Sequence, residues 1–294
     1  MEIKEYGNYG KCAVFRRAGT KVMVTVDLGP RIIWFGTEEM NFLNEDRERN
    51  VSKGGKYFDE NFGEGTEWFL YGGHRVWKSP EDLETYTPDN GPVEYQADEN
   101  GGIFVCRAAK RFDYALELRL DARGGLDIRN TVSYKGGGSA RIAVWGLTVA
   151  AKGGVMVLPL NEPVDDLNPV QNIVRWPYNE PDDERLFAGR SHLALRQTGK
   201  ENAVKIGAFV QKGRAYYVLG DKTMKLECAP EEGVYGDFWC NFESYTNSHI
   251  LEVEWLSPLK NLKCGESASM RERWSICDTP SDFAVSESGL ASFE

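Results

Sequence analysis

Alternation of apolar and polar residues with a period of two dominates this chain. Valine or leucine stands at every second position of 22–28, and tyrosine and leucine repeat this pattern in 114–121. Successive side chains of a β-strand point to opposite faces, so this period predicts strands with one buried face. Further strands are expected at 11–17, 31–36, 103–109, 126–134, 140–150, 191–197, 203–211, 214–220, 222–228, 247–256 and 268–277, with glycine- or asparagine-rich turns between them. Many short strands joined by tight turns predict an all-β sandwich with very little helix.

Two segments depart from simple alternation. Residues 140–150 are apolar at both parities after Arg141, which is typical of a strand covered on both faces near the middle of a large sheet. Residues 79–82, Ser-Pro-Glu-Asp, predict one short helix, because a serine N-cap precedes proline at the first helical position.

The length of 294 residues and a hydrophobic content of 41% allow one large core, and we expect a single domain over residues 1–294. Two long surface excursions interrupt it, near 41–66 and 159–183, where glycine, asparagine, proline and acidic residues gather. Loops of this length on a rigid β scaffold tend to form binding clefts.

Charge and motif content exclude several classes of protein. The net charge is −10 and no lysine or arginine block occurs, so a nucleic-acid partner is not expected. Neither an apolar leader nor a span of about 18 apolar residues is present, which predicts a cytoplasmic protein without membrane contact. We expect a monomer or a homodimer. The six cysteines form no CxxC pair, and phosphate-loop, GxSxG and HExxH patterns are absent, so neither metal nor cofactor is expected.

The segment Tyr71-Gly-Gly-His-Arg-Val-Trp77 is the first candidate site. His74 can exchange a proton near neutral pH, Arg75 beside it can hold an anion, and Trp77 offers an aromatic face to a sugar. The alternative is that His74 is one of the more common structural histidines.

Glu252 and Glu254 form the second candidate site. Strand alternation places both carboxylates on one face of an apolar strand. Burial and mutual repulsion would raise one pKa, which makes a carboxyl group a usable acid or base near pH 7. Equally, one of the pair could neutralise a buried arginine of the following strand, Arg271 or Arg273.

Weaker candidates lie elsewhere. Asp237 stands in an aromatic connection, residues 235–239, that could bind sugar or could be a surface loop held by its rings. Arg31 follows a Gly-Pro turn and could contact a ligand or pair with an acid. Together Arg31, Arg75 and Lys78 could form a cationic corner for a sugar phosphate, or make ordinary ion pairs.

A set of motifs in a fixed order carries a family resemblance: GPRII, Asn41, YGGHRVWKSPED, Pro88-Asp-Asn, IAVWGLT, Val174-Arg-Trp-Pro-Tyr, YGDFWCNFESYTNSHILEVEWLSPL, CGES and Glu272-Arg-Trp. Over residues 11–277 the chain resembles the galactose mutarotase-like (aldose 1-epimerase-like) superfamily, in a bacterial branch of mostly unassigned function. The resemblance implies a large β-supersandwich that binds carbohydrate in a cleft on one sheet.

The resemblance also implies roles for residues. His74 with Arg75 matches a histidine that lines the sugar site, Glu254 is the closest match to the family's base with Glu252 second, and Asp237 matches an aspartate that binds sugar hydroxyls. True mutarotases supply a second histidine, their usual general acid, in the region of 142–148, where this chain has Trp145 and Thr148.

The leading hypothesis is anomer interconversion of a monosaccharide or oligosaccharide without a cofactor. Glu254 would act as base and His74 as acid, converging on one sugar-sized hollow. A non-catalytic sugar-binding or sensing protein is the second hypothesis, because the family's second histidine is missing. A glycoside hydrolase with two carboxylates is the third, and the distance between the carboxylates would decide it.

Overall fold

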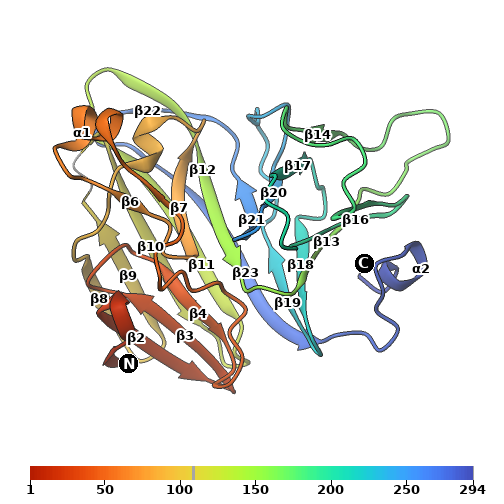
Figure 1. Cartoon of the computed structure of the whole chain (residues 1–294), viewed down its shortest axis with the longest axis horizontal. Coiled ribbons are helices and arrows are strands. Elements are labelled where there is room, and N and C mark those ends of the chain that lie inside the picture. The colour runs from red at the N-terminus through yellow and green to blue at the C-terminus, as the bar shows by residue number, and fades with distance from the viewer. Residues whose placement is uncertain (108–109, 294) are drawn as a thin grey trace.

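The structure, a computed structural model, describes residues 1–107 and 110–293. The described residues form two large antiparallel sheets, of eleven and ten strands, that pack face to face (Figure 1). In spatial order the first sheet contains β1 (Glu2–Glu5), β2 (Lys11–Arg17), β3 (Thr20–Thr25), β4 (Ile32–Gly36), β7 (Gly73–Ser79), β12 (Ser139–Ala150), β21 (Leu251–Leu256), β20 (Phe242–Thr246), β17 (Val204–Ala208) and β14 (Ile173–Arg175), with β22 (Lys260–Lys263) beside β12.

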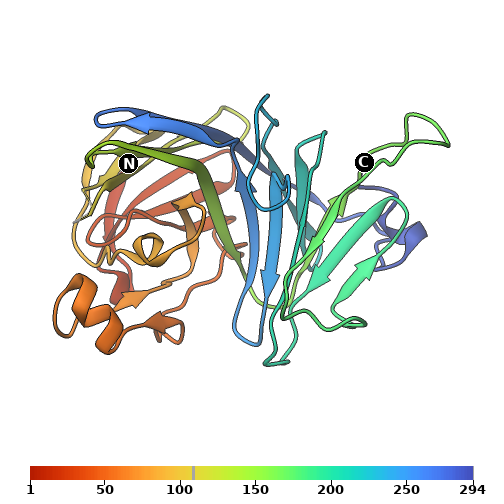
Figure 2. The same ribbon diagram turned by 90° about the horizontal axis from the view of Figure 1, so that it is seen from above.

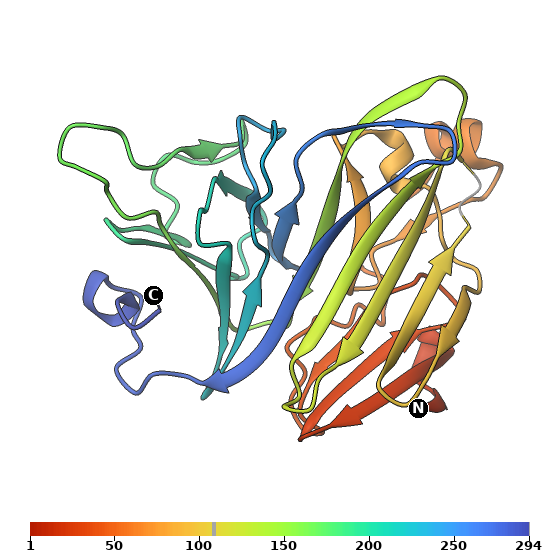
Figure 3. The same ribbon diagram turned by 180° about the vertical axis from the view of Figure 1, so that it is seen from behind.

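The second sheet lies behind the first and is nearest the viewer in Figure 3. Its strands, in spatial order, are β15 (Leu186–Ala188), β16 (His192–Arg196), β13 (Val155–Pro159), β18 (Arg214–Leu219), β19 (Lys222–Glu227), β23 (Ser267–Asp278), β11 (Leu126–Tyr134), β10 (Phe112–Leu120), β9 (Gly101–Cys106) and β8 (Glu94–Ala97). A small two-stranded sheet pairs β5 (Ser52–Lys53) with β6 (Trp68–Phe69). The all-β prediction is confirmed.

Alternation along the strands builds the core. In β10 and β11 every second residue is buried, and these residues meet the inner face of the first sheet. β12 is buried at every position from Ile142 to Ala150 and lies between β7 and β21, which confirms the prediction of a covered strand inside a large sheet. Trp255 of β21 and Trp274 of β23 are fully buried between the sheets.

Several strand boundaries differ from prediction, and the two described here involve the segments 247–256 and 103–109. The segment 247–256 is a strand only from Leu251, because the side chain of Asn247 accepts hydrogen bonds from the backbone of His249 and Ile250 and closes a turn. Of the predicted strand 103–109, residues 108–109 lie outside the described residues, and β9 ends at Cys106.

The helix predicted at 79–82 is wrong in position and type. Ser79 is the last residue of β7, and the helix that follows is a short 3₁₀ helix, η2 (Leu83–Tyr86). Its N-cap is Asp82, whose carboxylate accepts from the Thr85 amide while the Asp82 amide donates to the Thr85 hydroxyl. A reciprocal pair of this kind satisfies two helix-end donors, which the Ser79 hydroxyl could not do from within a strand.

Three other short helices occur among the described residues: η1 (Gly7–Tyr9), α1 (Lys56–Phe62) and α2 (Glu287–Leu290). α1 belongs to the excursion near 41–66, and Figure 2 shows it in orange outside the two sheets. None of the described helices has the length and apolar character needed to cross a membrane.

Candidate functional site

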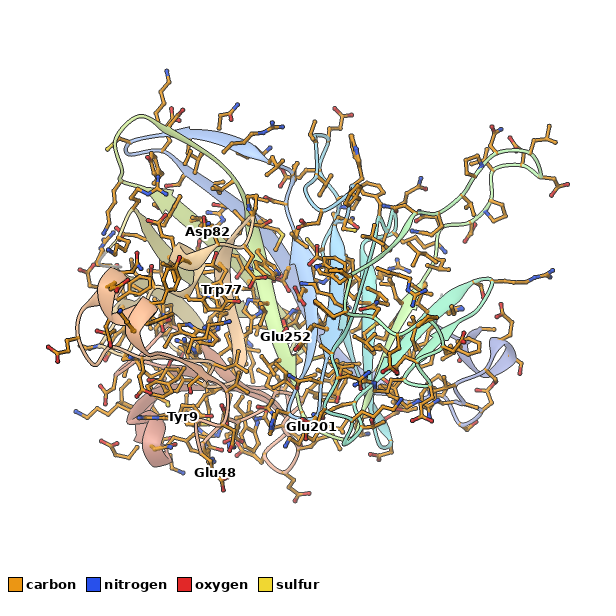
Figure 4. The ribbon with its side chains drawn as sticks, turned by 45° about the horizontal axis from the view of Figure 1, so that its top comes forward. Tyr9, Glu48, Trp77, Asp82, Glu201 and Glu252 are labelled. Carbon is orange, nitrogen blue, oxygen red and sulfur yellow. The ribbon has the colours of Figure 1, made fainter. Side chains whose placement is uncertain are left out.

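The outer face of the first sheet carries the candidate site. In antiparallel pairs, residues directly opposite each other share a face. Trp77 of β7, Trp145 of β12 and Leu256 of β21 are opposite one another, and so are Arg75, Leu147 and Glu254. Figure 4 labels Trp77 and Glu252, which come from β7 and β21 with β12 between them. A second apolar cluster therefore covers the outer face, separate from the core between the sheets.

A cleft of about 330 Å³ opens on this face. Both predicted excursions contribute to it, Val51 and Lys53 from one and Trp176 and Tyr178 from the other. Aromatic rings make up much of the lining: Trp68, Trp77, Tyr86, Trp145, Trp176, Tyr178 and Tyr245.

The rings on the floor of the cleft hold one another in place. Trp77 packs edge to face against Trp145, with ring centroids 5.4 Å apart, and lies 5.6 Å from Trp68. Tyr86 of η2 contacts both Trp68 and Trp77 edge to face, at 5.1 and 5.3 Å. Mutual packing of this kind gives a firm apolar platform.

A smaller recess of about 150 Å³ adjoins the cleft. It shares Glu81, Trp145, Trp176 and Lys205 with the cleft and is otherwise lined by Ser79, Pro80, Asp237, Glu243 and Leu256. The cleft and the recess together form one hollow with two lobes.

Lys205 of β17 is the central charge of this hollow. Its Nζ lies 2.7 Å from Glu243 Oε2 and 3.0 Å from Glu254 Oε2. The ammonium also lies 5.0 Å from the ring centroids of both Trp145 and Trp176. Burial alone would lower the pKa of Lys205, but the charges of Glu254 and Glu243 outweigh it and hold this pKa well above its ordinary value, so the lysine stays protonated.

Glu254 is fully buried behind the lining of the hollow and is not itself part of that lining. Its Oε2 accepts from Trp145 Nε1 at 2.9 Å as well as from Lys205, and its Oε1 has no hydrogen-bond partner among the described residues. Burial raises the pKa of Glu254 above its ordinary value despite the lysine. The partner is thus a lysine of β17, whereas Arg273 pairs with Asp121 and Asp127 at the surface, so the arginine alternative is wrong for Arg273.

Glu252 is the carboxyl group that faces the open part of the cleft. It lines the cleft and is only partly buried, and its carboxyl oxygens accept no hydrogen bond from any residue that the structure describes. Burial first, and then the charge of Glu254, raise the pKa of Glu252 to about 8. Burial and the same neighbour likewise raise the pKa of Glu243 to about 8. A carboxyl group with such a pKa exchanges protons near neutral pH.

Solved structures with the same architecture identify the fold. A galactose mutarotase-like protein from Lactobacillus casei superposes with a TM-score of 0.53 at 11% identity, covering 90% of this chain and 100% of that one. Another from Clostridium acetobutylicum gives 0.52 at 12% identity over 95% and 99% of the two chains, and a protein of Synechocystis sp. PCC 6803 gives 0.53 at 11% over 90% and 95%. The chain has the galactose mutarotase-like fold. No family model and no curated protein matches it.

Within this mutarotase-like sandwich, His74 lies on the wrong side of β7 for the cleft. Its ring is fully buried between the sheets, with Nδ1 2.9 Å from Thr148 Oγ1 and Nε2 2.9 Å from Asn130 Oδ1. Burial lowers the pKa of His74, which favours the neutral ring. Arg75 shares the face of Glu254, and its neighbour His74 therefore points to the opposite face of the sheet. The predicted convergence of His74 and Glu254 on one hollow is wrong.

The predicted cationic corner does not form. Arg31 is fully buried and makes two 2.7 Å hydrogen bonds to Asp89, while Lys78 pairs with Asp82. Arg75 lies beneath the cleft floor, 4.9 and 5.0 Å from the rings of Trp68 and Trp77, and donates to the backbone carbonyl of Leu70. Carboxylates of the protein thus pair with Arg31 and Lys78, whereas Arg75 is buried away from the cleft and its Nε and Nη1 have no hydrogen-bond partner among the described residues.

Asp237 and Trp77 do lie where a ligand could contact them, in the recess and the cleft respectively. The sequence reasoning missed Lys205 and Glu81. A lone lysine inside the apolar run Val204-Lys-Ile206 was the available signal for Lys205, since a buried lysine needs a carboxylate partner. Glu81 gave no such signal, because it comes from the irregular segment after β7. Among the described residues, no group of three or more His, Cys, Asp or Glu side chains is placed to hold a metal ion.

Proposed function

We propose that this protein binds a saccharide in the cleft and interconverts its anomers. The observation that carries the proposal is the combination, on one sheet face, of a tryptophan platform and a free carboxyl group, Glu252. Aromatic rings cover the apolar face of a sugar, and carboxylates accept hydrogen bonds from its hydroxyls. The mutarotase-like fold of the solved structures supports the same reading of this face.

Two groups in the hollow suit the chemistry. Glu252 in its ionised form would take the proton of the anomeric hydroxyl; the bond from C1 to the ring oxygen breaks, and C1 becomes a carbonyl carbon. Lys205 directs N–H groups to Glu243 and Glu254, and a lysine ammonium has three, so one is left to donate a hydrogen bond to the ring oxygen while that oxygen takes a proton from water in the open cleft. Rotation about the C1–C2 bond then exposes the other face of the carbonyl. Ring closure, with both proton transfers reversed, yields the other anomer.

The test is polarimetry or saturation-transfer NMR on freshly dissolved single anomers. Replacing Glu252→Gln should lower the rate by about 10² to 10⁴, the usual contribution of a positioned acid or base. Because the pKa of Glu252 is about 8 and the ionised form is the base, kcat/KM should rise as the pH increases through that value. The matched control is Glu60→Gln, on α1, which should leave the rate unchanged. Absence of acceleration with every sugar would remove the catalytic part.

A second candidate, saccharide binding without turnover, is favoured by one observation. The described residues include all three histidines, and none of them lines the cleft or the recess. Calorimetry and polarimetry together separate the candidates. For a binding protein, Trp77→Ala should weaken the sugar affinity strongly and Glu252→Gln only mildly. Anomers should then interconvert no faster in the presence of the protein than in buffer alone.

The hydrolase hypothesis gains no such support. Glu252 and Glu254 stand on one strand face, with Cα atoms roughly 6.6 Å apart. Glu254 is already bound to Lys205 and Trp145, so the two carboxyl groups do not stand on either side of a ligand.

A further inference from the structure

The turn that carries Asp237 has an unusual backbone. Asp237, Phe238 and Trp239 adopt positive φ angles of 45°, 56° and 69°, and the Cys240 amide donates to the Gly236 carbonyl at 3.2 Å. Three successive residues with side chains in the left-handed region are costly, since this conformation disfavours a Cβ at each one. The side chain of Asn172 donates to the carbonyls of Phe238 and Trp239, at 3.0 and 3.4 Å, and so ties the turn to a neighbouring loop.

The same turn leaves two large apolar rings in solvent. Phe238 is 84% exposed and Trp239 is 54% exposed. Strain of this kind persists where the surrounding structure enforces it, and it gathers at ligand-binding sites. Because these aromatic rings are exposed to solvent, the strained turn does not stabilise the hydrophobic core.

The turn adjoins the hollow. Asp237 lines the recess, and the recess shares Trp145, Trp176 and Lys205 with the cleft. The path from the tryptophan platform to the turn therefore leads from one lobe to the other, and both carboxylates and aromatic rings line it. A ligand confined to the larger lobe would leave the recess and the turn unused.

We propose that the ligand is an oligosaccharide, with one terminal ring in the cleft, the next in the recess beside Asp237, and a further ring against Phe238 and Trp239. This inference rests on the proposed function, because it presupposes a sugar in the cleft. A chain of sugar rings fits the surface, since each ring has an apolar face for an aromatic side chain and hydroxyls for a carboxylate.

The experiment is calorimetry with neutral gluco, galacto, manno and xylo monosaccharides and their di- and trisaccharides. For the configuration that binds, affinity should increase with chain length by on the order of threefold to tenfold from one ring to three. The double variant Phe238→Ala with Trp239→Ala should lose the gain from two rings to three and keep the affinity for the mono- and disaccharide. Both side chains are largely exposed, so the variant should fold normally.

The matched control is Tyr95→Ala, an exposed ring on β8 of the second sheet, which should behave like the unmodified protein. Equal affinity for one ring and three, in a protein that binds the monosaccharide, would overturn the oligosaccharide inference and leave the proposed function standing. Failure of every sugar in the panel to bind would overturn both.

Discussion

At the scale of single residues, Glu252 and Glu254 show how position along a strand sets chemistry. They are two residues apart on the same face of β21, yet Lys205 and Trp145 bind Glu254, whereas Glu252 faces the open cleft. The sequence predicted a shared face and a raised pKa for one of the pair. It could not rank the two, because the deciding neighbour, Lys205, lies on β17, two strands away in the sheet.

His74 is the residue for which local reasoning failed. An imidazole next to arginine and tryptophan suggested a site, but the strand places His74 and Trp77 on opposite faces. Around the ring, Asn130 donates to Glu272 Oε1 at 2.6 Å, and Trp274 donates to Glu272 Oε2 at 3.1 Å, so the histidine belongs to a polar network between the sheets.

A variant of His74 distinguishes a structural role in the core from a role in ligand binding. His74→Ala removes a partner of Asn130 and Thr148 inside the core, so the free energy of unfolding should fall by about 2 to 4 kcal/mol. Sugar affinity, measured at a temperature where the variant is folded, should stay within twofold of the unmodified protein. Chemical denaturation and calorimetry provide the two measurements. Loss of affinity without loss of stability would return His74 to the binding site.

At the scale of elements, β12 connects the core to the cleft. Its Trp145 faces the cleft, and its neighbour Gly146 faces the polar network between the sheets. A Cβ at Gly146 would lie 2.1 Å from Glu272 Oε1 and 3.0 Å from Asn130 Nδ2. The glycine is thus a space requirement of the network, which no local sequence pattern could reveal.

Gly146→Ala should therefore destabilise the protein. The carboxylate of Glu272 would have to move from its buried hydrogen bonds, and overpacking of this kind typically costs about 1 to 3 kcal/mol. Urea denaturation measures the loss. The control is Gly137→Ala in the turn before β12, where a new Cβ meets no atom within 4 Å, and stability should be nearly unchanged. Equal stability of the two variants would contradict the crowding argument.

At the scale of the whole molecule, alternation and turn signals predicted the sandwich well, because they report directly which face of a strand is buried. The excursions were also recognisable, and both supply walls of the cleft. The composition of the site was less predictable. Glu243 and Lys205 control the charge of the hollow; Glu243 comes from β20, which pairs with β21, and Lys205 comes from β17, which lies one strand further and approaches Glu254 only once the sheet has formed.

Charge across the hollow predicts selectivity. Acidic side chains line it, namely Glu81, Asp237, Glu243 and Glu252, against Lys53 and the already paired Lys205. Above about pH 8, where Glu243 and Glu252 are ionised, a sugar that carries a phosphate or carboxylate should therefore bind at least about tenfold more weakly than its neutral parent at low salt, and added salt should narrow this difference in affinity. Calorimetry at two salt concentrations measures both effects. Tighter binding of the phosphorylated sugar would contradict this account.

The two walls of the cleft come from separate excursions, whereas Trp77 and Trp145 of the floor belong to strands of the first sheet. Exchanging residues near Val51 or Trp176 would reshape the entrance at little expense to folding. Exchanging Trp145 would change the shape of the cleft and the stability of the sheet at the same time. In a lineage of such proteins, ligand preference is thus free to drift through the loops while the sheet beneath stays the same.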